Sequence, residues 1–515
     1  MILADYLKKK PFSRREFSAS QYRPQKGTPR MAQMRKPGAQ VMFFSQEQYM
    51  NELHSGSHVI YDCIYRSMRP KYKWNAEKQV NELDGYDDVT RMSVSWQEAI
   101  RSNKAATCGG NAPWIGNEGD EENAKYVATL KSYCNRINLQ AALMSLFTSA
   151  FGTADGALYF YRDGDDIAWQ CFSYEYGSNC TMSKDYENPD EEMGVRYFDL
   201  EGRDAVELYR NKYIELYVKF KDVEEMLSVY PDAYSQEESL DPEKPEDMAT
   251  VKRHIETEDH YFLVIRKAHG LEESPFCYFR EPDTPYGPVQ NNIEDWEKLL
   301  SDCGENIKYY AYQMLFIRGG AMNLPNANFG GKVLGSKSPD GDAKILEPAD
   351  ASNTLTIGFK ETRNAICDGS KSVFIKPEDL KGQNDSGAYI ANLYWPEIQW
   401  AKLFYARFHH CMVKILRVIK QLVGLIEGDS TGFRTAKVSY MFTPFLPKNS
   451  LEETQILQYS VEAGFMSQET AAEESDYTNP NERERLAKEK AERQRMELEA
   501  ARAVATPEPT PAPTK

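Results

Sequence analysis

The chain has 515 residues, of which 41% are hydrophobic, 12% aromatic and 27% charged, and its formal net charge is −16. A chain of this length and composition is expected to bury the cores of roughly two to four folding units, which excludes an intrinsically disordered protein. The acidic balance disfavours a general nucleic-acid binder, because contacts to phosphates depend on clusters of Lys and Arg.

The cysteines and the apolar stretches indicate a cytosolic protein without a membrane span. The two closest cysteines, Cys171 and Cys180, are too far apart for a CxxC motif, which excludes zinc-knuckle and thioredoxin-like sites. The nine cysteines are an odd number, and the N-terminal MILADYLKKK has no apolar core of a signal peptide, so we expect reduced thiols. The most apolar stretch, CMVKILRVIKQLVGLI, contains Lys414, Arg417 and Lys420, so no membrane helix is predicted.

The N-terminal segment is predicted to be a basic arm. Residues 1–40 contain ten Lys and Arg against Asp5 and Glu16. Such a segment is solvated, or it docks on an acidic surface or on nucleic acid. Further along, the Gly, Asn and Pro of residues 109–124 predict a loop, and residues 136–151 predict a buried helix that ends at Gly152.

Short strands are predicted next. Residues 157–174 are typical of a β-hairpin whose aromatic strands flank the turn Asp163-Gly164-Asp165-Asp166. This turn lacks the remaining ligands of a calcium loop, so turn chemistry is the better interpretation. Residues 213–220 and 260–268 predict two more strands, separated by an acidic, proline-containing segment at 235–247. The first half is therefore mixed α/β without a doubly wound sheet.

A helix, a small β module and a second helix follow. Residues 292–317 predict a helix that ends at Gly319-Gly320, and residues 331–348 predict a hairpin with the turn Ser338, Pro339, Asp340, Gly341. In the second helix, about 350–367, one face carries Leu355, Phe359, Thr362 and Ile366, whereas Lys360 and Arg363 lie elsewhere. The two helices are expected to pack antiparallel and to hold the β module at one end.

A polar loop then leads into a very long helix. Apolar residues recur every three or four positions from 390 to 422, which predicts a helix from Gly387, capped by Asp385 or Ser386, to Gly424 or Gly428. Pro396 removes one internal hydrogen bond, so a kink near Asn392–Pro396 is expected. A helix this long and kinked is typical of a large assembly.

The C-terminal region is predicted to contain short helices and a tail. Residues 449–475 predict two helices, with a Ser450–Glu453 capping box and a stop at Gly464. Residues 481–503 predict a charged helix supported by pairs such as Glu484 with Lys488, and TPEPTPAPTK is expected to be disordered.

Three stretches in this order resemble the portal protein family of tailed double-stranded DNA bacteriophages, siphophage-type branch. HGLEESPFCYFRE (269–281) is similar to the segment that enters the family's first stem helix, and PEDLKGQNDSGAYIANLYWPEIQWA (377–401) to its tunnel loop and wing helix. LQYSVEAGFMSQETAAEE (457–474), followed by NERERLAKEKAE, is similar to its AG…S-x-E-T segment with a charged trailer. The resemblance covers about residues 150–490. Two departures are SDYTNPN in place of an aspartate-rich turn, and the basic arm.

The resemblance implies a helix-rich α+β portal fold of wing, stem, clip and crown that assembles as a ring around a central channel. On this sequence the parts are a basic N-terminal arm 1–45, wing 46–291, stem helix 1 292–317, clip 318–349, stem helix 2 350–368, tunnel loop 369–386, the wing's long kinked helix and following strand 387–448, crown 449–490, and a charged helix end with a disordered tail 491–515.

The function implied is that of a portal, the head-to-tail connector: a late virion protein through which the viral genome is packaged and ejected. The implied partners are further copies in a homo-oligomer, usually a dodecamer, double-stranded DNA in the channel, the terminase large subunit, the major capsid protein and scaffold, and a head–tail adaptor protein. The implied location is the portal vertex of the capsid, reached from the host cytoplasm during assembly. No cofactor, metal or catalytic site is implied, since ATP hydrolysis belongs to the terminase.

The expected channel residues lie on the tunnel loop and the stem. Lys371, Lys376 and Lys381 stand beside Glu378, Asp379 and Asp385, so the loop has no net charge. In a ring these groups would form alternating charged rings that centre DNA without gripping it; alternatively they are ordinary loop charges. Lys360 and Arg363 are further candidates. The clip either pairs its strands between subunits or is a mobile loop, and the Pro396 kink either lets the tunnel loop shift or follows the wing's curvature.

Two other classes remain as alternatives: another virion ring or adaptor protein, and a cytosolic carbohydrate-active hydrolase. Adaptors are generally shorter and lack the helix–hairpin–helix with a long kinked helix. The sequence contains no P-loop, HExxH or GxSxG motif, which disfavours an enzyme. The closest pairs of metal-ligating residues are His54 with His58 and His409 with His410, and neither has a third ligand nearby.

Overall fold

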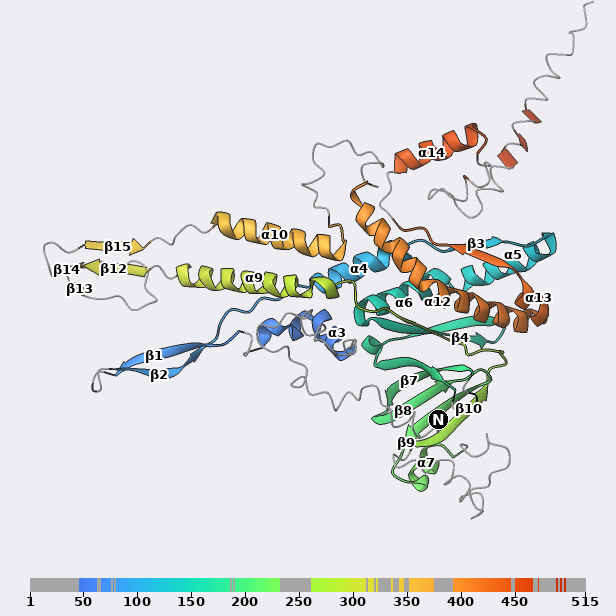
Figure 1. The fold of residues 1–515 in the computed structure, drawn as a ribbon, viewed down its shortest axis with the longest axis horizontal. Helices are drawn as coiled ribbons and strands as arrows, with labels where there is room; N and C mark the ends of the chain where they lie inside the picture. The colour runs from blue at the N-terminus through green and yellow to red at the C-terminus, as the bar shows by residue number, and fades with distance from the viewer. Residues whose placement is uncertain are drawn as a thin grey trace, which may run out of the picture. The chain divides into compact units, whose positions relative to one another are not determined.

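A helical layer forms the centre of the fold in the computed structural model of the chain (Figure 1). The chain divides into two compact units, Met1–Phe374 with Pro396–Phe445, and Ile375–Trp395 with Leu446–Lys515. The structure describes residues 46–62, 66–75, 77, 80–185, 188, 190–231, 261–311, 314–318, 321–322, 335–336, 342–346, 352–374, 392–445, 450–465, 471, 488–489, 491–492 and 495–496.

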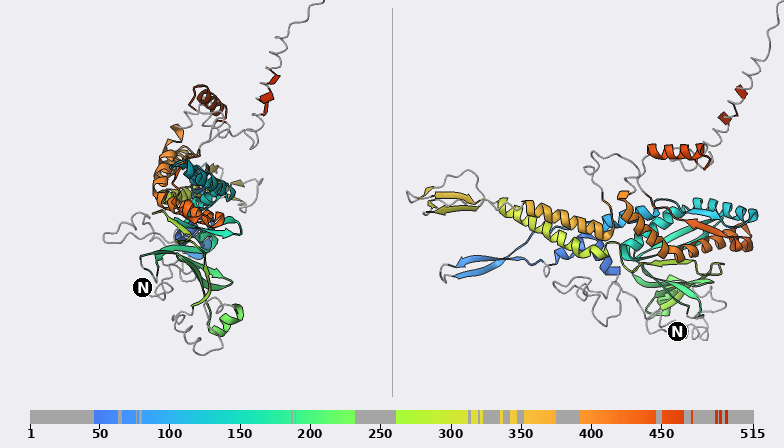
Figure 2. Two further views of the ribbon diagram at one scale, coloured as in Figure 1. Left: turned by 90° about the vertical axis from the view of Figure 1, so that its right-hand side faces the viewer. Right: turned by 45° about the horizontal axis from the view of Figure 1, so that its top comes forward.

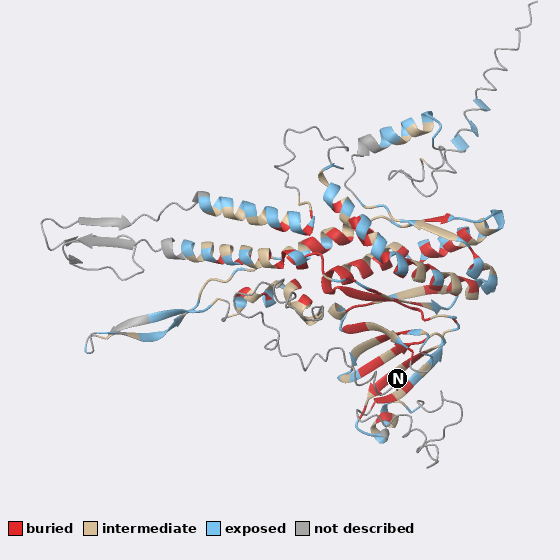
Figure 3. Cartoon of the chain, in the orientation of Figure 1, coloured by how far each residue is buried: buried red, intermediate tan, exposed pale blue. Residues whose placement is uncertain are grey.

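The main core of the first unit is built around two apolar helices. These are α6 (Leu139–Thr153) and α12 (Trp395–Glu427), supported by α4 (Trp96–Gly109) and α5 (Glu121–Arg136). Phe147 of α6 contacts Phe404 and Phe408 of α12 edge-to-face, with ring centroids 4.9 Å apart in both pairs. The apolar period predicted for the long helix is therefore buried as expected, and Figure 3 shows this face of α12 in red.

Helix α6 differs from its prediction at both ends. It begins after the N-cap Asn138 and includes Gly152, so the expected stop at Gly152 is wrong. The left-handed residue that ends the helix is Ala154, with φ 66°. Gly152 is instead a position of close approach: a Cβ there would lie 3.1 Å from Nε of Arg101, and the Gly152 carbonyl accepts a hydrogen bond from Tyr286 Oη at 2.7 Å.

Antiparallel sheets lie beyond this helical layer. Strands β4 (Asp155–Asp163) and β5 (Asp166–Phe172) form the predicted hairpin, with Gly164 at φ 63° in a two-residue turn, and β11 (Phe276–Arg280) pairs on the other side of β4. A five-stranded sheet has the order β10-β9-β8-β7-β6. Its strands are β6 (Ser178–Lys184), β7 (Glu192–Leu200), β8 (Arg203–Tyr209), β9 (Tyr213–Lys219) and β10 (Tyr261–Ala268), and α7 (Val223–Val229) follows β9. The strands predicted at 213–220 and 260–268 are thus confirmed.

A strand within residues 109–124 was not predicted. The segment β3 (Trp114–Asn117) pairs antiparallel with β16 (Val438–Met441), which follows α13 (Ser430–Thr435). The prediction of a continuous loop at 109–124 is wrong because a four-residue strand gains its pairing from a partner more than 300 residues away, which no local pattern reveals.

The N-terminal described part contains α3 (Gln46–Leu53), two short 3₁₀ turns, Ser55–Ser57 and Val59–Tyr61, and the hairpin β1 (Arg69–Asn75) with β2 (Val80–Asp87). The basic arm predicted at 1–45 lies outside the described residues. Further 3₁₀ turns stand at Tyr174–Tyr176 and Gly287–Val289.

Helices α9 (Gln290–Ala311) and α10 (Ser352–Ser370) pack antiparallel, as Figure 2 shows. Ile293 of α9 and Ile366 of α10 lie in one buried cluster. Further along α9, Trp296 packs edge-on against Phe359, which comes before Ile366 in α10, with ring centroids 5.0 Å apart. Contacts in this order are those of two antiparallel helices. The predicted helix 292–317 is too long, because its last residues belong to a strand, β12 (Met314–Arg318).

The strands between these helices are nested, and this corrects the predicted hairpin at 331–348. Strand β12 pairs with β15 (Asp342–Leu346), and β13 (Ala321–Met322) pairs with β14 (Gly335–Ser336). Strand β15 thus pairs with β12, which lies before the glycine-rich stretch in the sequence. Five residues of each strand are paired, from Met314 opposite Leu346 to Arg318 opposite Asp342. The predicted turn Ser338–Gly341 lies outside the described residues.

In the second unit, α14 (Ser450–Glu462) confirms the first of the two helices predicted near the C-terminus, and Gly464 follows it at φ 76°. Most of the second short helix, the charged helix and the tail lie outside the described residues. None of the helices in the described part of the chain is long and apolar enough to cross a membrane.

Candidate functional site

The start of the predicted tunnel loop is a short root segment, residues 371–374, directly after α10. The Lys371 N–H donates to the Asp368 carbonyl at 3.2 Å, and the Ser372 N–H donates to the Cys367 carbonyl at 3.0 Å. These two bonds make a Schellman motif, in which the left-handed residue is usually Gly. Here it is Lys371, with φ 52°. A left-handed conformation costs a non-glycine residue about 1–2 kcal/mol, so contacts around the root segment must hold it.

Those contacts come from a buried ion pair, Lys104 of α4 with Glu397 of α12. Both side chains are fully buried, and Lys104 Nζ lies 3.6 Å from Glu397 Oε1. Lys104 Nζ also donates to the Lys371 carbonyl at 2.5 Å, beside the C-terminal end of α10 where a positive charge is favoured. Glu397 Oε1 accepts the Val373 N–H at 3.3 Å and Nδ2 of Asn103 at 2.5 Å.

The surroundings of this pair shift both pKa values towards the neutral forms. Burial lowers the pKa of Lys104 to about 8, and the carboxylate of Glu397 opposes the shift. Burial likewise raises the pKa of Glu397, against the effect of Lys104. The ring of Trp400 also contacts the ammonium, with Nζ 4.9 Å from its centroid. Each member is therefore held mainly by the other and by the backbone of the root segment.

The predicted channel cations do not all have the same role in the structure. Lys360 and Lys371 are exposed. Arg363 is half-buried, and its Nη2 donates to the Phe374 carbonyl at 2.8 Å, so this side chain binds the root segment. Lys376 and Lys381 lie outside the described residues.

Pro396 lies two residues after a break in the helix. Asn392 and Leu393 are helical, a turn lies at Tyr394, and α12 begins at Trp395. Pro396 is thus in the first turn of α12, where a missing N–H costs no helical hydrogen bond. The break at Tyr394 falls within the range 392–396 for which a kink was predicted. Residue Glu397 follows it in the same first turn, where a carboxylate is favoured by the helix dipole.

A second set of contacts, missed by sequence reasoning, holds α9. An extended strap, residues 90–94, donates alternate backbone N–H groups to side chains one helical turn apart. The bonds are Val94 N–H to Glu297 Oε1 at 2.9 Å, Met92 N–H to Ser301 Oγ at 2.9 Å, and Thr90 N–H to Glu305 Oε2 at 2.8 Å. Two residues of extended chain span about 6.6 Å and four residues of helix about 6 Å, so the two repeats match. Glu297 is also 2.5 Å from Nδ1 of the buried His58.

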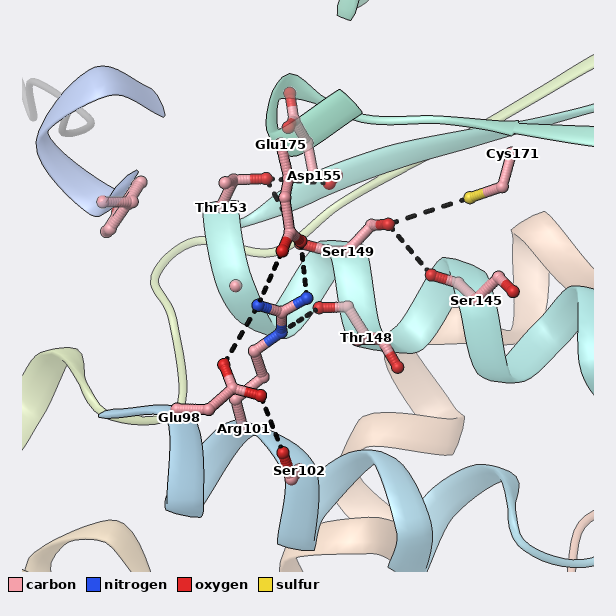
Figure 4. Close-up of polar contacts among 12 residues, drawn as sticks. Glu98, Arg101, Ser102, Ser145, Thr148, Ser149, Thr153, Asp155, Cys171 and Glu175 are labelled. Atoms are coloured by element: carbon pink, nitrogen blue, oxygen red, sulfur yellow. Dashed lines mark hydrogen bonds and ion pairs between the residues drawn. The ribbon is translucent and has the colours of Figure 1, made fainter. Parts of the chain in front are cut away.

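A third polar cluster joins the helical layer to the first sheet (Figure 4). Arg101 of α4 donates to the Thr148 carbonyl at 3.0 Å and lies between two carboxylates, Glu98 at 3.1 Å and Glu175 at 2.5 Å. Close by, burial raises the pKa of Asp155 to about 7, although Gln46 and Tyr278 both donate hydrogen bonds to its carboxylate. Arg101 is satisfied by these acceptors, which is the pattern of a structural network, whereas Gln46 Oε1 is buried without a hydrogen-bond partner.

The histidines considered as metal ligands have other partners. His58 binds Glu297 and the Glu52 carbonyl, and His409 lies 2.5 Å from Tyr440 Oη. Among the residues that the structure describes, no group of three or more His, Cys, Asp or Glu side chains could hold a metal ion.

Few features of the sequence pointed to the buried pair. Lys104 and Glu397 lie within apolar helical faces, and a charged residue on such a face is the signal that could have pointed to a partner. The strap has a clearer signature, since Glu297, Ser301 and Glu305 recur every four residues along one face of α9.

The comparison with protein families matches residues 71–496 to the family described as "Phage portal protein, SPP1 Gp6-like". Among solved structures, a chain of "Neck of empty GTA particle computed with C6 symmetry" is 11% identical, and the match covers 72% of this chain and 86% of that chain. Its TM-score is 0.32, and at this level the likeness supports no conclusion about the present chain. The comparison with curated proteins gives no match.

Proposed function

Because the chain belongs to the SPP1 Gp6-like family of phage portal proteins, we propose that it forms the ring at one capsid vertex through which double-stranded DNA is packaged and later ejected. The observation that carries this proposal is the family match, which extends over residues 71–496 and so includes most of the wing, both stem helices and the whole crown as we assign them.

The arrangement around the root segment is consistent with this role. Helices α9 and α10 would be the stem, the nested strands between them the clip, and residues 369–386 the tunnel loop that precedes α12. In this assignment the exposed Lys360 and Lys371 would face DNA, together with Lys376 and Lys381. The half-buried Arg363 would mainly support the loop, because its guanidinium binds the Phe374 carbonyl.

The charge of the loop favours transient contacts with DNA. Its three lysines are balanced by Glu378, Asp379 and Asp385, so a ring of copies would neutralise few phosphates in total. Affinity for DNA rises with the number of phosphates neutralised and falls with salt accordingly. A balanced loop would centre the duplex and still release it at each step.

The remaining partners are proposed on the same basis. The ring, usually a dodecamer in the family, would dock the terminase large subunit during packaging and a head–tail adaptor afterwards, and would be incorporated with the major capsid protein and scaffold. It would move from the host cytoplasm into the virion. The chain itself would be non-catalytic, with ATP hydrolysis supplied by the terminase.

Native mass spectrometry and negative-stain imaging of the purified chain test the proposal together. The expected result is a particle near twelve times 59.0 kDa that appears as a ring with a central hole. A well-folded monomer at micromolar concentration would refute it. A smaller closed ring without bound terminase would favour the alternative of an adaptor protein.

A further inference from the structure

We infer that Lys104 and Glu397 are positioning residues that lock the base of the tunnel loop to the wing, by joining the backbone before the loop to the helix after it. We call the two bonds from these side chains to the backbone, Lys104 to the Lys371 carbonyl and Glu397 to the Val373 N–H, the lock. The lock is inferred from the geometry of the pair, and the role of the loop rests on the proposed function.

The two ends of the loop meet at one carboxylate. Val373 precedes residues 375–391, and Glu397 follows them in the first turn of α12. The Glu397 carboxylate accepts the Val373 N–H at 3.3 Å, which closes a loop of 24 residues at its base. A side chain that bonds to the backbone at the opposite end of a loop fixes the separation of the two ends whatever the loop does between them.

Lys104 fixes the other feature of the base, the unusual backbone of Lys371. Its Nζ donates to the Lys371 carbonyl at 2.5 Å, and α4 thereby holds the one left-handed non-glycine residue of the root segment. The neighbouring Asn103 donates to Glu397, so two consecutive residues of α4 bind the two sides of the loop's base: Lys104 binds Lys371 before the loop, and Asn103 binds Glu397 after it. Phe374 then packs edge-on against Trp96 of the same helix, with ring centroids 5.5 Å apart.

The lock acts through backbone bonds, and this sets it apart from an ion pair that merely stabilises the core. In Glu397→Gln, the amide oxygen still accepts the Val373 N–H, and Lys104, whose pKa burial already lowers, can release its proton and still donate an amine N–H to the Lys371 carbonyl. In the double variant Lys104→Met/Glu397→Leu, apolar side chains fill the site, and replacing a buried ion pair in this way is often neutral for stability. Both backbone bonds are lost, however.

The test is hydrogen–deuterium exchange on the assembled full-length protein, read in peptides that cover residues 371–374. We expect Glu397→Gln to exchange at nearly the wild-type rate, and the double variant to exchange about tenfold faster or more, since a lost hydrogen bond corresponds to about that factor. Thermal unfolding of each variant controls for global destabilisation. As a control, Asp185→Leu/Arg210→Met removes a buried ion pair of the five-stranded sheet (Nε to Oδ2, 2.8 Å). It also removes the contact of Arg210 with Glu215, which keeps Arg266 as a cation, and it should leave residues 371–374 unchanged.

Wild-type exchange at 371–374 in a double variant with wild-type thermal stability would overturn the inference, and so would rapid exchange in Glu397→Gln. The consequence for the proposed function is read separately, as DNA packaged into empty heads by a terminase motor. We expect packaging to fall at least tenfold in the double variant, although ring mass is unchanged; wild-type packaging by it would overturn the positioning role. If the wild-type chain forms no ring, the proposed function fails, and the exchange data still decide whether the lock exists.

Discussion

We predict that Asp155 makes the stability of the first compact unit dependent on pH, in a direction opposite to that of most carboxylates. Its side chain is buried between α3 and β11, where it receives hydrogen bonds from Gln46 and Tyr278, and the charge of Arg280 partly opposes the effect of burial. Burial raises the pKa of Asp155 from 3.8 to about 7. Because the folded state binds this proton more tightly than the unfolded chain, the contribution is complete below about pH 4 and is lost as the pH rises through 7.

The difference between 3.8 and about 7 corresponds to roughly 4 kcal/mol, at about 1.4 kcal/mol for each pH unit. Relaxation around a charged Asp155 reduces this figure, so we expect Asp155→Asn to stabilise the protein by about 2–4 kcal/mol at pH 8. The new amide has a partner ready, since Gln46 Oε1 is buried without a hydrogen bond and can accept from Asn Nδ2 after the Gln46 amide turns over.

The assay is thermal unfolding of wild type and Asp155→Asn between pH 4.5 and 8.5. The variant should gain several degrees over the wild type at pH 8, and the gap should close towards pH 4.5. Asp165→Asn is the matched control, because Asp165 lies in the β4–β5 turn with 99% of its side chain exposed, and we expect its curve to follow the wild type. Parallel curves for Asp155→Asn and wild type over this range would refute the reasoning.

Three further predictions concern the root segment and the strap. Lys371→Gly relieves the left-handed strain and leaves the carbonyl that Lys104 binds, so we expect unchanged or up to about 1 kcal/mol higher stability in thermal unfolding; a loss above 1 kcal/mol would mean that the Lys371 side chain itself holds the segment. Glu297→Ala leaves the Val94 N–H and Nδ1 of His58 without an acceptor, and we expect a loss of about 1–3 kcal/mol with faster amide exchange at residue 94. The exposed Asp295→Ala on the same helix should change neither. Arg363→Ala should speed amide exchange at residues 371–374, because its guanidinium binds the Phe374 carbonyl. Lys360→Ala should leave this exchange unchanged and should lower the salt-dependent affinity of the proposed ring for DNA. The reverse pattern would exchange the roles we assign to these two cations.

The elements that were predictable from sequence are those whose signal is local. The period of α12 recurs over many turns, and the β4–β5 hairpin carries its turn residues between two aromatic strands. The elements that were missed depend on distant partners. Strand β3 exists because β16 pairs with it, and β15 prefers β12 to the nearer residues after Gly331. No window of sequence contains both sides of such a pairing, so turn chemistry at Ser338–Gly341 pointed to the wrong partner.

The same reasoning explains why the candidate site was only half visible. The lysines of the proposed tunnel loop are conspicuous in sequence because they stand in a polar loop, whereas Lys104 and Glu397 lie on the buried faces of two helices, 293 positions apart, among other charged residues. Burying one such charge alone is very costly, so each makes sense only once the other is placed beside it.

The strap and the lock together attach both proposed stem helices to the wing through main-chain atoms. The strap gives three backbone N–H groups to α9, and the lock takes one backbone carbonyl and one N–H directly after α10. Main-chain atoms cannot change rotamer, so these attachments fix the positions of the helices more closely than contacts between two long side chains would. If a ring transmits force between the proposed stem and wing while DNA moves, these five backbone groups are one path for it, beside the buried apolar cluster in which Ile293 and Ile366 contact α4. Loosening either attachment should weaken the coupling of one helix without unfolding the other.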